Sequence, residues 1–180
     1  MLGMEKTEEI TFDDHNHFLT GNVDGESIEK AIRWILMGSR KPSPEHPMKL
    51  HINSDGGNLT DAFALIDVMR TSPVPIATVG MGNLMSSAFM IFAAGKKGQR
   101  AIAKNTSIMI HQFNHEISGK YHDIKAFSQE FDRINQRMLN TLIDCSGMSE
   151  DDVRKYLLGP TDSWMDAYQL KEYGIADYIF

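Results

Sequence analysis

The sequence contains a single cysteine, Cys145, so no disulfide bond can form within the chain. A chain with so few cysteines is typical of proteins in a reducing compartment. Long hydrophobic runs are also missing: the longest apolar-rich stretch, residues 84–94, falls well short of the ~20 residues that a membrane-spanning helix needs. Because the N-terminal residues lack the basic-then-apolar pattern of a signal peptide, we expect a soluble cytoplasmic protein with no membrane partner.

Basic residues are outnumbered as well. The chain carries 18 Lys and Arg against 24 Asp and Glu, which gives a net charge of -6. The basic side chains form no stripe, and phosphate contacts require a clustered positive surface, so nucleic-acid binding is not expected. With 42% apolar residues the chain can bury a substantial core. Its length fits one domain, which we place at residues 17–180 behind a flexible segment of residues 1–16.

Strand-like and helix-like segments alternate through the first two-thirds of the chain, which predicts parallel βαβ units in an α/β fold. The predicted strands cover residues 17–21, 48–53, 76–80, 100–103, 107–111 and 175–179. The predicted helices cover residues 27–37, 58–70, 86–94 and 123–146, and shorter helices begin at Ser149 and Asp166. Residues 54–57 and 81–85 are predicted turns, and the proline-rich residues 39–47 a loop.

Ser86 is the first candidate for chemistry. It follows a glycine-containing turn and opens an apolar helix, and a helix N-terminus offers unpaired N–H groups that stabilise developing negative charge. Serines at helix starts are also common caps, and the sequence is not a G-x-S-x-G elbow, so both interpretations stay open. His111 ends an apolar strand, where it is either a base for the serine proton or a structural histidine.

The turn of residues 54–57, SDGG, lies between a strand and a helix. Its paired glycines let backbone N–H groups face an oxyanion or a phosphate, although an ordinary turn has the same pattern. No Gly-Lys-Ser/Thr follows, so a nucleotide-binding P-loop is excluded. Asp162, in the polar turn GPTDS, is one carboxylate among many.

The histidines give only weak indications of a metal site. His111 and His115 have the spacing of HExxH, but Gln112 stands where that motif has Glu and the local pattern is that of a strand, so no zinc site is expected. His15 and His17 are an equally weak pair.

Several segments together resemble the Clp protease proteolytic subunit, a family of serine peptidases, from residue 18 to the C-terminus. FLTGNVDGESIEKAI resembles the family's FLGGxVDDxSAxxI, LHINSDGG its YINSPGG, and IMIHQ its VMIHQ. GNLMSSAFMIFAAGKKGQR is similar to GQAASMGALLLAAGAKGKR, and DSWMDAYQLKEYGIAD to DRFLSAxEAxEYGLID. With these segments in order and at matching spacing, the chain is identified as a member of this ClpP-like family.

The resemblance implies a serine endopeptidase with a catalytic triad. Ser86 falls on the nucleophile, His111 on the general base and Asp162 on the acid that orients the histidine. Gly56 and Ser87, the residue after the nucleophile, fall on the two backbone N–H donors of the oxyanion hole. Ser87 stands where the family has Met, a change that a backbone donor tolerates. No metal is implied, and no cofactor in this chain.

The family fold implies stacked βαβ units that form a head, with residues 123–146 as a long handle helix. It also implies seven-membered rings of this chain, stacked face to face, alone or with other Clp ring subunits, that act on unfolded polypeptides. The handles and the strand after His111 make the contact between rings. The segment FNHEISGKY lacks the proline and glycines usual there, a departure that bears on this contact.

ATP enters only through a partner unfoldase of the AAA+ Clp type. The family's aromatic residues that help to receive the unfoldase's hydrophobic loops are replaced here by Lys49 and His51, which alternate along one strand and share a face. Desolvating a charged lysine against an apolar loop is costly, so we expect weak docking of a standard unfoldase.

Two other functions stay open. One is a non-catalytic structural subunit of a mixed Clp ring, against which the retained triad argues. The other is an acyl-CoA-processing enzyme on the related crotonase-like fold, whose oxyanion turn looks similar but whose chemistry does not need a Ser-His-Asp set.

Overall fold

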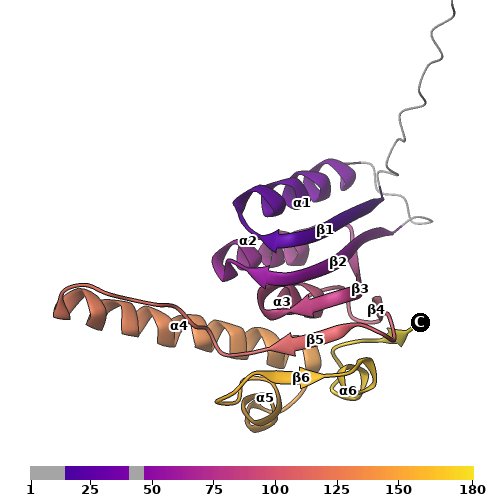
Figure 1. Ribbon diagram of the computed structural model, residues 1–180. Coiled ribbons are helices and arrows are strands. Elements are labelled where there is room, and N and C mark those ends of the chain that lie inside the picture. Colours follow the sequence, from indigo (N-terminus) through magenta and orange to yellow (C-terminus); the bar gives the residue numbers. More distant parts are fainter. Residues whose placement is uncertain (1–14, 41–46) are drawn as a thin grey trace, which may run out of the picture.

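A computed structural model describes residues 15–40 and 47–180 of the protein. Most of the segment expected to be flexible, and most of the loop at residues 39–47, lie outside the described residues. Within the described ranges, seven strands join in one sheet, with helices packed against it (Figure 1).

The strands are β1 (Asn16–Val23), β2 (Met48–Gly57), β3 (Ile76–Met85), β4 (Arg100–Ile102), β5 (Ser107–Ile110), β6 (Ser163–Met165) and β7 (Tyr178–Ile179). The helices are α1 (Gly25–Gly38), α2 (Leu59–Thr71), α3 (Ser86–Ala93), α4 (Tyr121–Ser146), α5 (Glu150–Tyr156) and α6 (Ala167–Glu172). The sheet runs in the order β1-β2-β3-β4-β7, and all these pairs are parallel. β5 pairs with β3 in parallel and with β6 in antiparallel orientation. The predicted α/β fold of parallel βαβ units is therefore confirmed.

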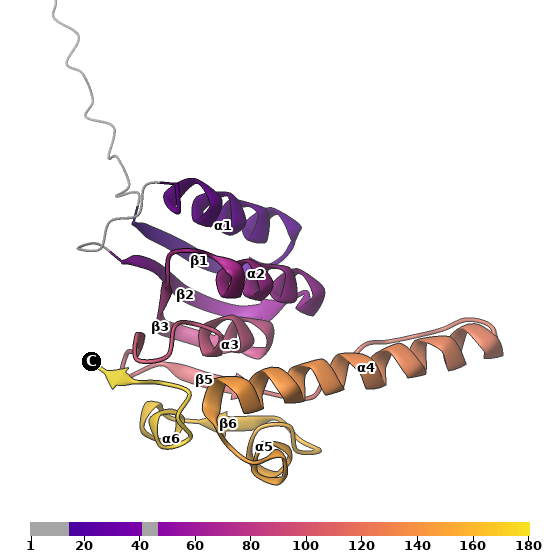
Figure 2. The ribbon, with the colours of Figure 1, turned by 180° about the vertical axis from the view of Figure 1, so that it is seen from behind.

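Helices α1, α2 and α3 cover one face of the sheet, which Figure 2 shows from the helix side. The sequence dictates this arrangement through caps and apolar periodicity. Asp24 caps α1 in a capping box with Ser27, and Asn58 caps α2 by accepting from the N–H groups of Thr60 and Asp61. Apolar side chains spaced three and four residues apart then turn inward, as Ile28, Ala31 and Ile35 do on α1.

The sheet extends beyond the predicted strand ends, because β2 and β3 continue through both segments that we expected to be turns. The register of β1 against β2 shifts between Thr20 and Asn22, and that of β2 against β3 between Ile52 and Ser54. These irregularities let the strands keep pairing while the backbone bends. As a result, β3 pairs with β4 along residues 78–80 and with β5 along residues 83–85.

The C-terminal strand is shorter than predicted. Ile175 and Ala176 donate their N–H groups to the Leu170 carbonyl at the end of α6, at 3.1 and 3.2 Å, so only Tyr178–Ile179 pairs as β7. β6 was not predicted at all. Its three residues are too few to show a period, and antiparallel pairing with β5 defines it.

The 26-residue helix α4 divides into two halves with different surroundings. Its C-terminal half packs against α3 and α5, and Ile134, Met138 and Leu142 belong to the core there. Its N-terminal half projects away from the rest of the protein (Figure 1), and Ile124 and Phe127 are exposed. The apolar side chains that recur along α4 are therefore buried in the core in its C-terminal half and exposed in its N-terminal half.

A buried ion pair fixes the C-terminal segment to the sheet. The Arg100 guanidinium donates to the Asp177 carboxylate at 2.8 and 2.9 Å, and also to the carbonyls of Cys145 at 2.9 Å and Gly174 at 2.7 Å. Burial alone would raise the pKa of Asp177, but the hydrogen bonds and charge of Arg100 outweigh it and hold the pKa below its usual range.

We expect Arg100→Ala to lower the free energy of unfolding by about 3–5 kcal/mol, because it leaves a partly buried carboxylate and two carbonyls without their donor. Urea unfolding at neutral pH measures the loss. Arg154→Ala removes an exposed pair with Glu150 and should cost less than about 1 kcal/mol. The stabilisation by Asp177 is present above its unfolded pKa, near 3.9, and is lost as the pH falls through the lower folded value. Equal losses in the two variants would contradict the buried role.

Candidate active site

Ser86 occupies a sharp turn between the end of β3 and the start of α3. Its φ of +51° makes it the only non-glycine residue in the described ranges with a left-handed backbone. Such a conformation costs a side-chain-bearing residue about 1–3 kcal/mol, and residues held this way cluster at functional sites. The sequence is not a G-x-S-x-G elbow, yet strand, strained serine and helix follow one another as in that elbow. No sequence pattern signalled this strain.

The end of β2, residues 54–57, packs directly onto Ser86. A Cβ atom at Gly56, whose φ is +96°, would lie 2.8 Å from both the Met85 carbonyl oxygen and the Ser86 Cβ, and 3.1 Å from the Ser87 nitrogen. Only glycine permits this approach. It brings the backbones of Gly56 and Ser87, the two expected oxyanion donors, side by side.

The two donors differ in what they bind. The Gly56 N–H donates to the Ser54 Oγ at 3.0 Å, so it is engaged within the end of β2. Ser87 lies in the first turn of α3, whose N-cap residue, Met85, offers no side-chain hydrogen bond. Its N–H therefore belongs to the set that a helix start leaves without an intrahelical partner.

Ser86 and His111 face a common pocket of about 210 Å³. The strand register explains why both residues line it. Met85 pairs with Met109 between β3 and β5, so the residues that follow these two strands emerge at the same edge of the sheet. The pocket is lined by Asp55, Gly57, Leu59, Ser86, Met109, His111, Phe113, Asn114 and Met138.

The His111 imidazole is hydrogen-bonded through Nδ1 to the Gln112 carbonyl oxygen. A carbonyl only accepts, so this bond requires the proton on Nδ1 and leaves Nε2 free to accept one. Gln112 is itself anchored, because its Nε2 donates to the Leu158 carbonyl at 2.9 Å. The histidine is thus held in the tautomer that a general base needs.

Asp162 lies next to His111 in the strand register but does not bind it. Ile110 pairs with Ser163 between β5 and β6, which makes His111 and Asp162 the next residues along the two chains. The Asp162 carboxylate is exposed, is not part of the pocket lining, and takes part in none of the hydrogen bonds found among the described residues. The short strand β6, which the sequence did not reveal, is what carries Asp162 to this position.

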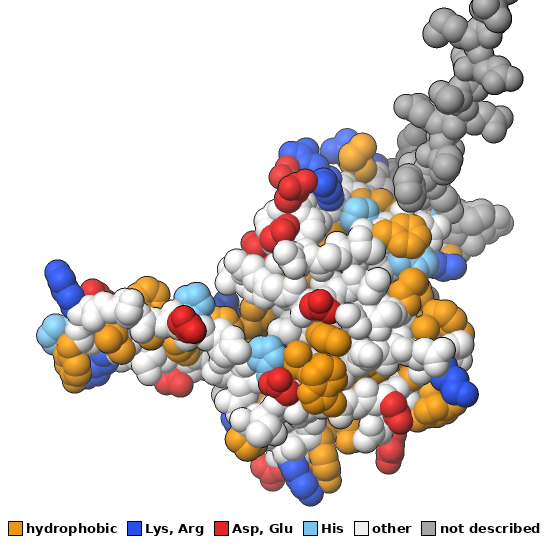
Figure 3. Space-filling model, viewed as in Figure 1, with side chains coloured by type: hydrophobic (Ala, Val, Ile, Leu, Met, Phe, Trp, Pro, Cys, Tyr) orange, Lys and Arg blue, Asp and Glu red, His pale blue; other side chains and the backbone are white. Residues whose placement is uncertain are grey.

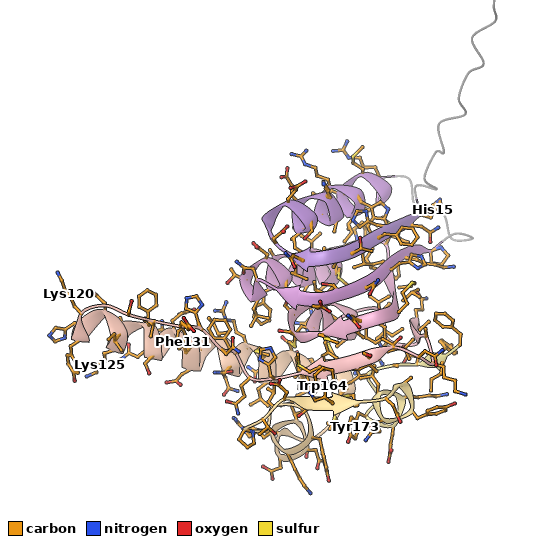
Figure 4. The ribbon with its side chains drawn as sticks, viewed as in Figure 1. His15, Lys120, Lys125, Phe131, Trp164 and Tyr173 are labelled. Atoms are coloured by element: carbon orange, nitrogen blue, oxygen red, sulfur yellow. The ribbon has the colours of Figure 1, made fainter. Side chains whose placement is uncertain are left out.

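Two other histidines singled out in the sequence, His115 and His17, belong to aromatic contacts. The His115 ring stacks on Phe113 at 6.2 Å and meets Phe131, midway along α4 in Figure 4, edge-on at 6.0 Å. The His17 ring stacks on Trp34 at 5.3 Å, and burial together with the nearby Lys30 charge lowers its pKa. Across residues 15–40 and 47–180, no group of three or more His, Cys, Asp or Glu side chains could hold a metal ion.

Lys49 and His51 lie on the face of the sheet that α1–α3 leave uncovered. Lys49 is exposed, whereas the His51 ring stacks on Phe18 of β1 with 4.7 Å between ring centres and bonds the Asn16 side chain through Nε2 at 2.8 Å. Burial and the Lys49 charge lower the pKa of His51. The sequence reasoning missed Phe18, which restores an aromatic surface beside the histidine.

No helix within the described residues has the length and apolarity needed to cross a membrane.

Comparison with known proteins gives a consistent result over nearly the whole chain. Residues 5–180 match the family model for Clp protease. ATP-dependent Clp protease proteolytic subunit 2 of Corynebacterium diphtheriae is 34% identical over 162 residues, which cover 90% of this chain and 80% of the relative.

Two further relatives agree. ATP-dependent Clp protease proteolytic subunit 1 of Corynebacterium jeikeium is 32% identical, covering 90% of this chain and 85% of the relative. Subunit 3 of Nocardia farcinica is 32% identical over 171 residues, covering 94% and 76%. The matched region includes the strained Ser86, the pocket that it shares with His111 and the end of β2 at Gly56, and the chain belongs to the Clp protease family.

Proposed function

We propose that the protein is a Clp-type serine endopeptidase subunit that hydrolyses peptide bonds in unfolded polypeptides. The observation that carries the proposal is the left-handed backbone of Ser86 at a strand-to-helix turn, facing His111 across one pocket. A cap serine needs no such strain, whereas a nucleophile gains exposure from it.

The geometry supports acyl transfer in two steps. His111 Nε2 takes the Ser86 hydroxyl proton as the oxygen attacks the scissile carbonyl, and the Ser87 N–H faces the resulting oxyanion. The Gly56 N–H joins it by exchanging the Ser54 hydroxyl for the oxyanion. Protonated His111 then gives its proton to the leaving amine, which leaves an acyl-Ser86 ester. Water, deprotonated by His111, hydrolyses that ester and restores the serine.

Asp162 is the third member in this proposal. In the single protomer the Gln112 carbonyl orients His111, and Asp162 lies at the neighbouring register position, directly before β6. A carboxylate stabilises the imidazolium that forms during attack far better than a carbonyl does. Rotation of His111 or Asp162 toward the other would therefore complete the triad.

An active-site label separates the catalytic from the non-catalytic alternative. A fluorophosphonate should modify Ser86 if His111 activates it, and a purely structural ring subunit should stay unlabelled. Turnover of peptides without turnover of acyl-CoA thioesters argues against the crotonase-like alternative. A protein that neither reacts with the label nor cleaves any peptide would sink the proposed function. The cytoplasmic location stays a prediction.

The exposed half of α4 supports the proposed stacking of rings. Tyr121, Ile124 and Phe127 leave 73%, 40% and 51% of their surface exposed, and Figure 3 shows hydrophobic side chains along this arm. Exposed apolar groups gathered on one element mark interaction sites. We propose that a second copy of the chain covers them and that α4 acts as the handle between two heptameric rings.

We expect Phe127→Asp to lower the native mass, as measured by analytical ultracentrifugation, because it places a carboxylate in the proposed contact. Ser128→Asp adds the same charge at the adjacent exposed position and should leave the mass unchanged. Met138 is unsuitable for this test, since it is 3% exposed and packs in the protomer's own core. A wild-type protein that sediments as a monomer would contradict the ring.

Docking of an unfoldase concerns the uncovered face of the sheet. Phe18, His51 and Val79 pair across β1, β2 and β3, so they form one row beside the charged Lys49. We expect weak ATP-driven degradation of a tagged folded substrate with a standard Clp unfoldase, and stronger degradation after Lys49→Tyr combined with His51→Tyr, since each aromatic anchor is worth about 2 kcal/mol. Strong wild-type degradation that the double change does not improve would contradict this.

A further inference from the structure

Asp55 places a carboxylate in the lining of the pocket. Among the described residues that line it, the others are neutral at pH 7 apart from the titratable His111. Asp55 directly precedes Gly56, and it stands where the similar family motif INSPGG has proline. The carboxylate is therefore a feature that the shared chemistry does not require.

The Asp55 carboxylate is held in place rather than free in solvent. Its Oδ1 accepts a hydrogen bond of 2.7 Å from the Asn83 side-chain amide. Asn83 is itself fixed, because its backbone N–H donates to the Asn53 Oδ1 at 2.9 Å. The second carboxylate oxygen, Oδ2, makes none of the hydrogen bonds found among the described residues, so it can accept from a ligand.

The rest of the lining complements such a charge. Leu59, Met109 and Met138 supply apolar surface, and a pocket of about 210 Å³ is smaller than the ~300–1,000 Å³ that admit drug-sized ligands. The space suits one long side chain of an extended peptide. Lysine and arginine combine an apolar stem with a charged head, which matches a lining of apolar side chains and one carboxylate.

We propose that Asp55 makes the site select peptides with Lys or Arg close to the scissile bond. This inference depends on the proposed function, because it assumes that peptides are cleaved at Ser86. The carboxylate attracts a cationic side chain and repels an acidic one, so it discriminates among substrates without taking part in bond cleavage. Since Asp55 is exposed, the preference is moderate and falls at high salt.

The test uses quenched fluorogenic peptides that differ at one position within three residues of the scissile bond, where Lys, Leu or Glu is placed. Mass spectrometry of the products locates the cleaved bond. For the assembled wild-type protein we expect kcat/KM for Lys to exceed that for Leu by about threefold to fivefold, with Glu lower than Leu by a similar factor. At about 1 M salt the three values should converge.

The variants isolate the charge. Asp55→Asn keeps an acceptor for Asn83 and should bring the Lys-to-Leu ratio near one, while Asp55→Lys should favour the Glu peptide. Asp67→Asn removes an equal charge from an exposed site on α2 outside the pocket and should keep the wild-type ratios. The ratios are the readout, so a general loss of turnover does not decide the matter.

Each outcome has a distinct meaning. Cleavage of all three peptides at equal rates, or an unchanged ratio in Asp55→Asn, would overturn the role of Asp55 while leaving the peptidase intact. If the Asp55 variants do not fold, a wild-type ratio that is insensitive to salt overturns it equally. No cleavage of any peptide, together with no labelling of Ser86, would overturn the proposed function and this inference with it.

Discussion

Replacing Ser86 by alanine should abolish peptide hydrolysis, lowering kcat by on the order of 10⁶. The alanine cannot form the acyl-enzyme, and no other hydroxyl is brought to the same pocket by the residues that the structure describes. Steady-state turnover of a fluorogenic peptide, with intact folding checked by circular dichroism, measures the loss. Ser107→Ala removes an exposed hydroxyl from β5 and should leave turnover unchanged.

A second substitution at the same position tests the strain itself. Glycine adopts a φ of +51° without steric cost, whereas alanine keeps the penalty. Ser86→Gly should therefore be inactive but more stable than Ser86→Ala by about 1 kcal/mol, in spite of the greater unfolded-state entropy of glycine. Equal stability would mean that Ser86 is not strained, and retention of more than a few per cent of turnover in either variant would remove it as the nucleophile.

Sequence periodicity was sufficient for the helices that pack against the sheet. On α1, apolar spacing predicted a helix over residues 27–37, which the structure shows over Gly25–Gly38 with Ile28, Ala31 and Ile35 buried. On α4, the same reasoning could not tell that Ile124 and Phe127 stay exposed while Met138 is buried. Periodicity defines an apolar face, but only the surrounding chain decides what covers it.

The candidate site was predicted from the sequence mainly through resemblance. Residue types and positions nominated Ser86 and His111 weakly, since a cap serine and a strand-end histidine look alike in any fold. The features that join them are non-local: the left-handed backbone at Ser86, the register of β3 against β5, and the close approach of Gly56. The hydrogen bond from the Gln112 side chain to the Leu158 carbonyl likewise joins segments far apart in the chain, which no local pattern encodes.

Asp162→Asn should lower kcat by about 10⁴ while leaving the fold intact. There are two physical reasons. The carboxylate favours the His111 tautomer with its proton on Nδ1, and it stabilises the imidazolium that forms when His111 takes the serine proton, whereas a neutral amide does neither as well. The comparison with Asp166→Asn is matched in chemistry and in chain position. Asp166 caps α6 through the N–H groups of Tyr168 and Gln169, and asparagine caps almost as well, so that change should cost little rate and little stability.

The structure makes the outcome at Asp162 informative in either direction, because the His111 Nδ1 binds the Gln112 carbonyl in the single protomer. If Asp162 replaces that carbonyl when the enzyme works, its loss removes the charge that stabilises the imidazolium, and the full effect appears. If the Gln112 carbonyl orients His111 throughout, Asp162→Asn should cost less than about tenfold, as for a bystander carboxylate. The size of the rate loss separates these two possibilities. Native mass measured on the same samples is the control, since a loss of rate with unchanged assembly assigns Asp162 to the chemistry rather than to the ring contacts. Equal losses at Asp162 and Asp166 would leave His111 without a carboxylate partner and the site with a serine and a histidine alone.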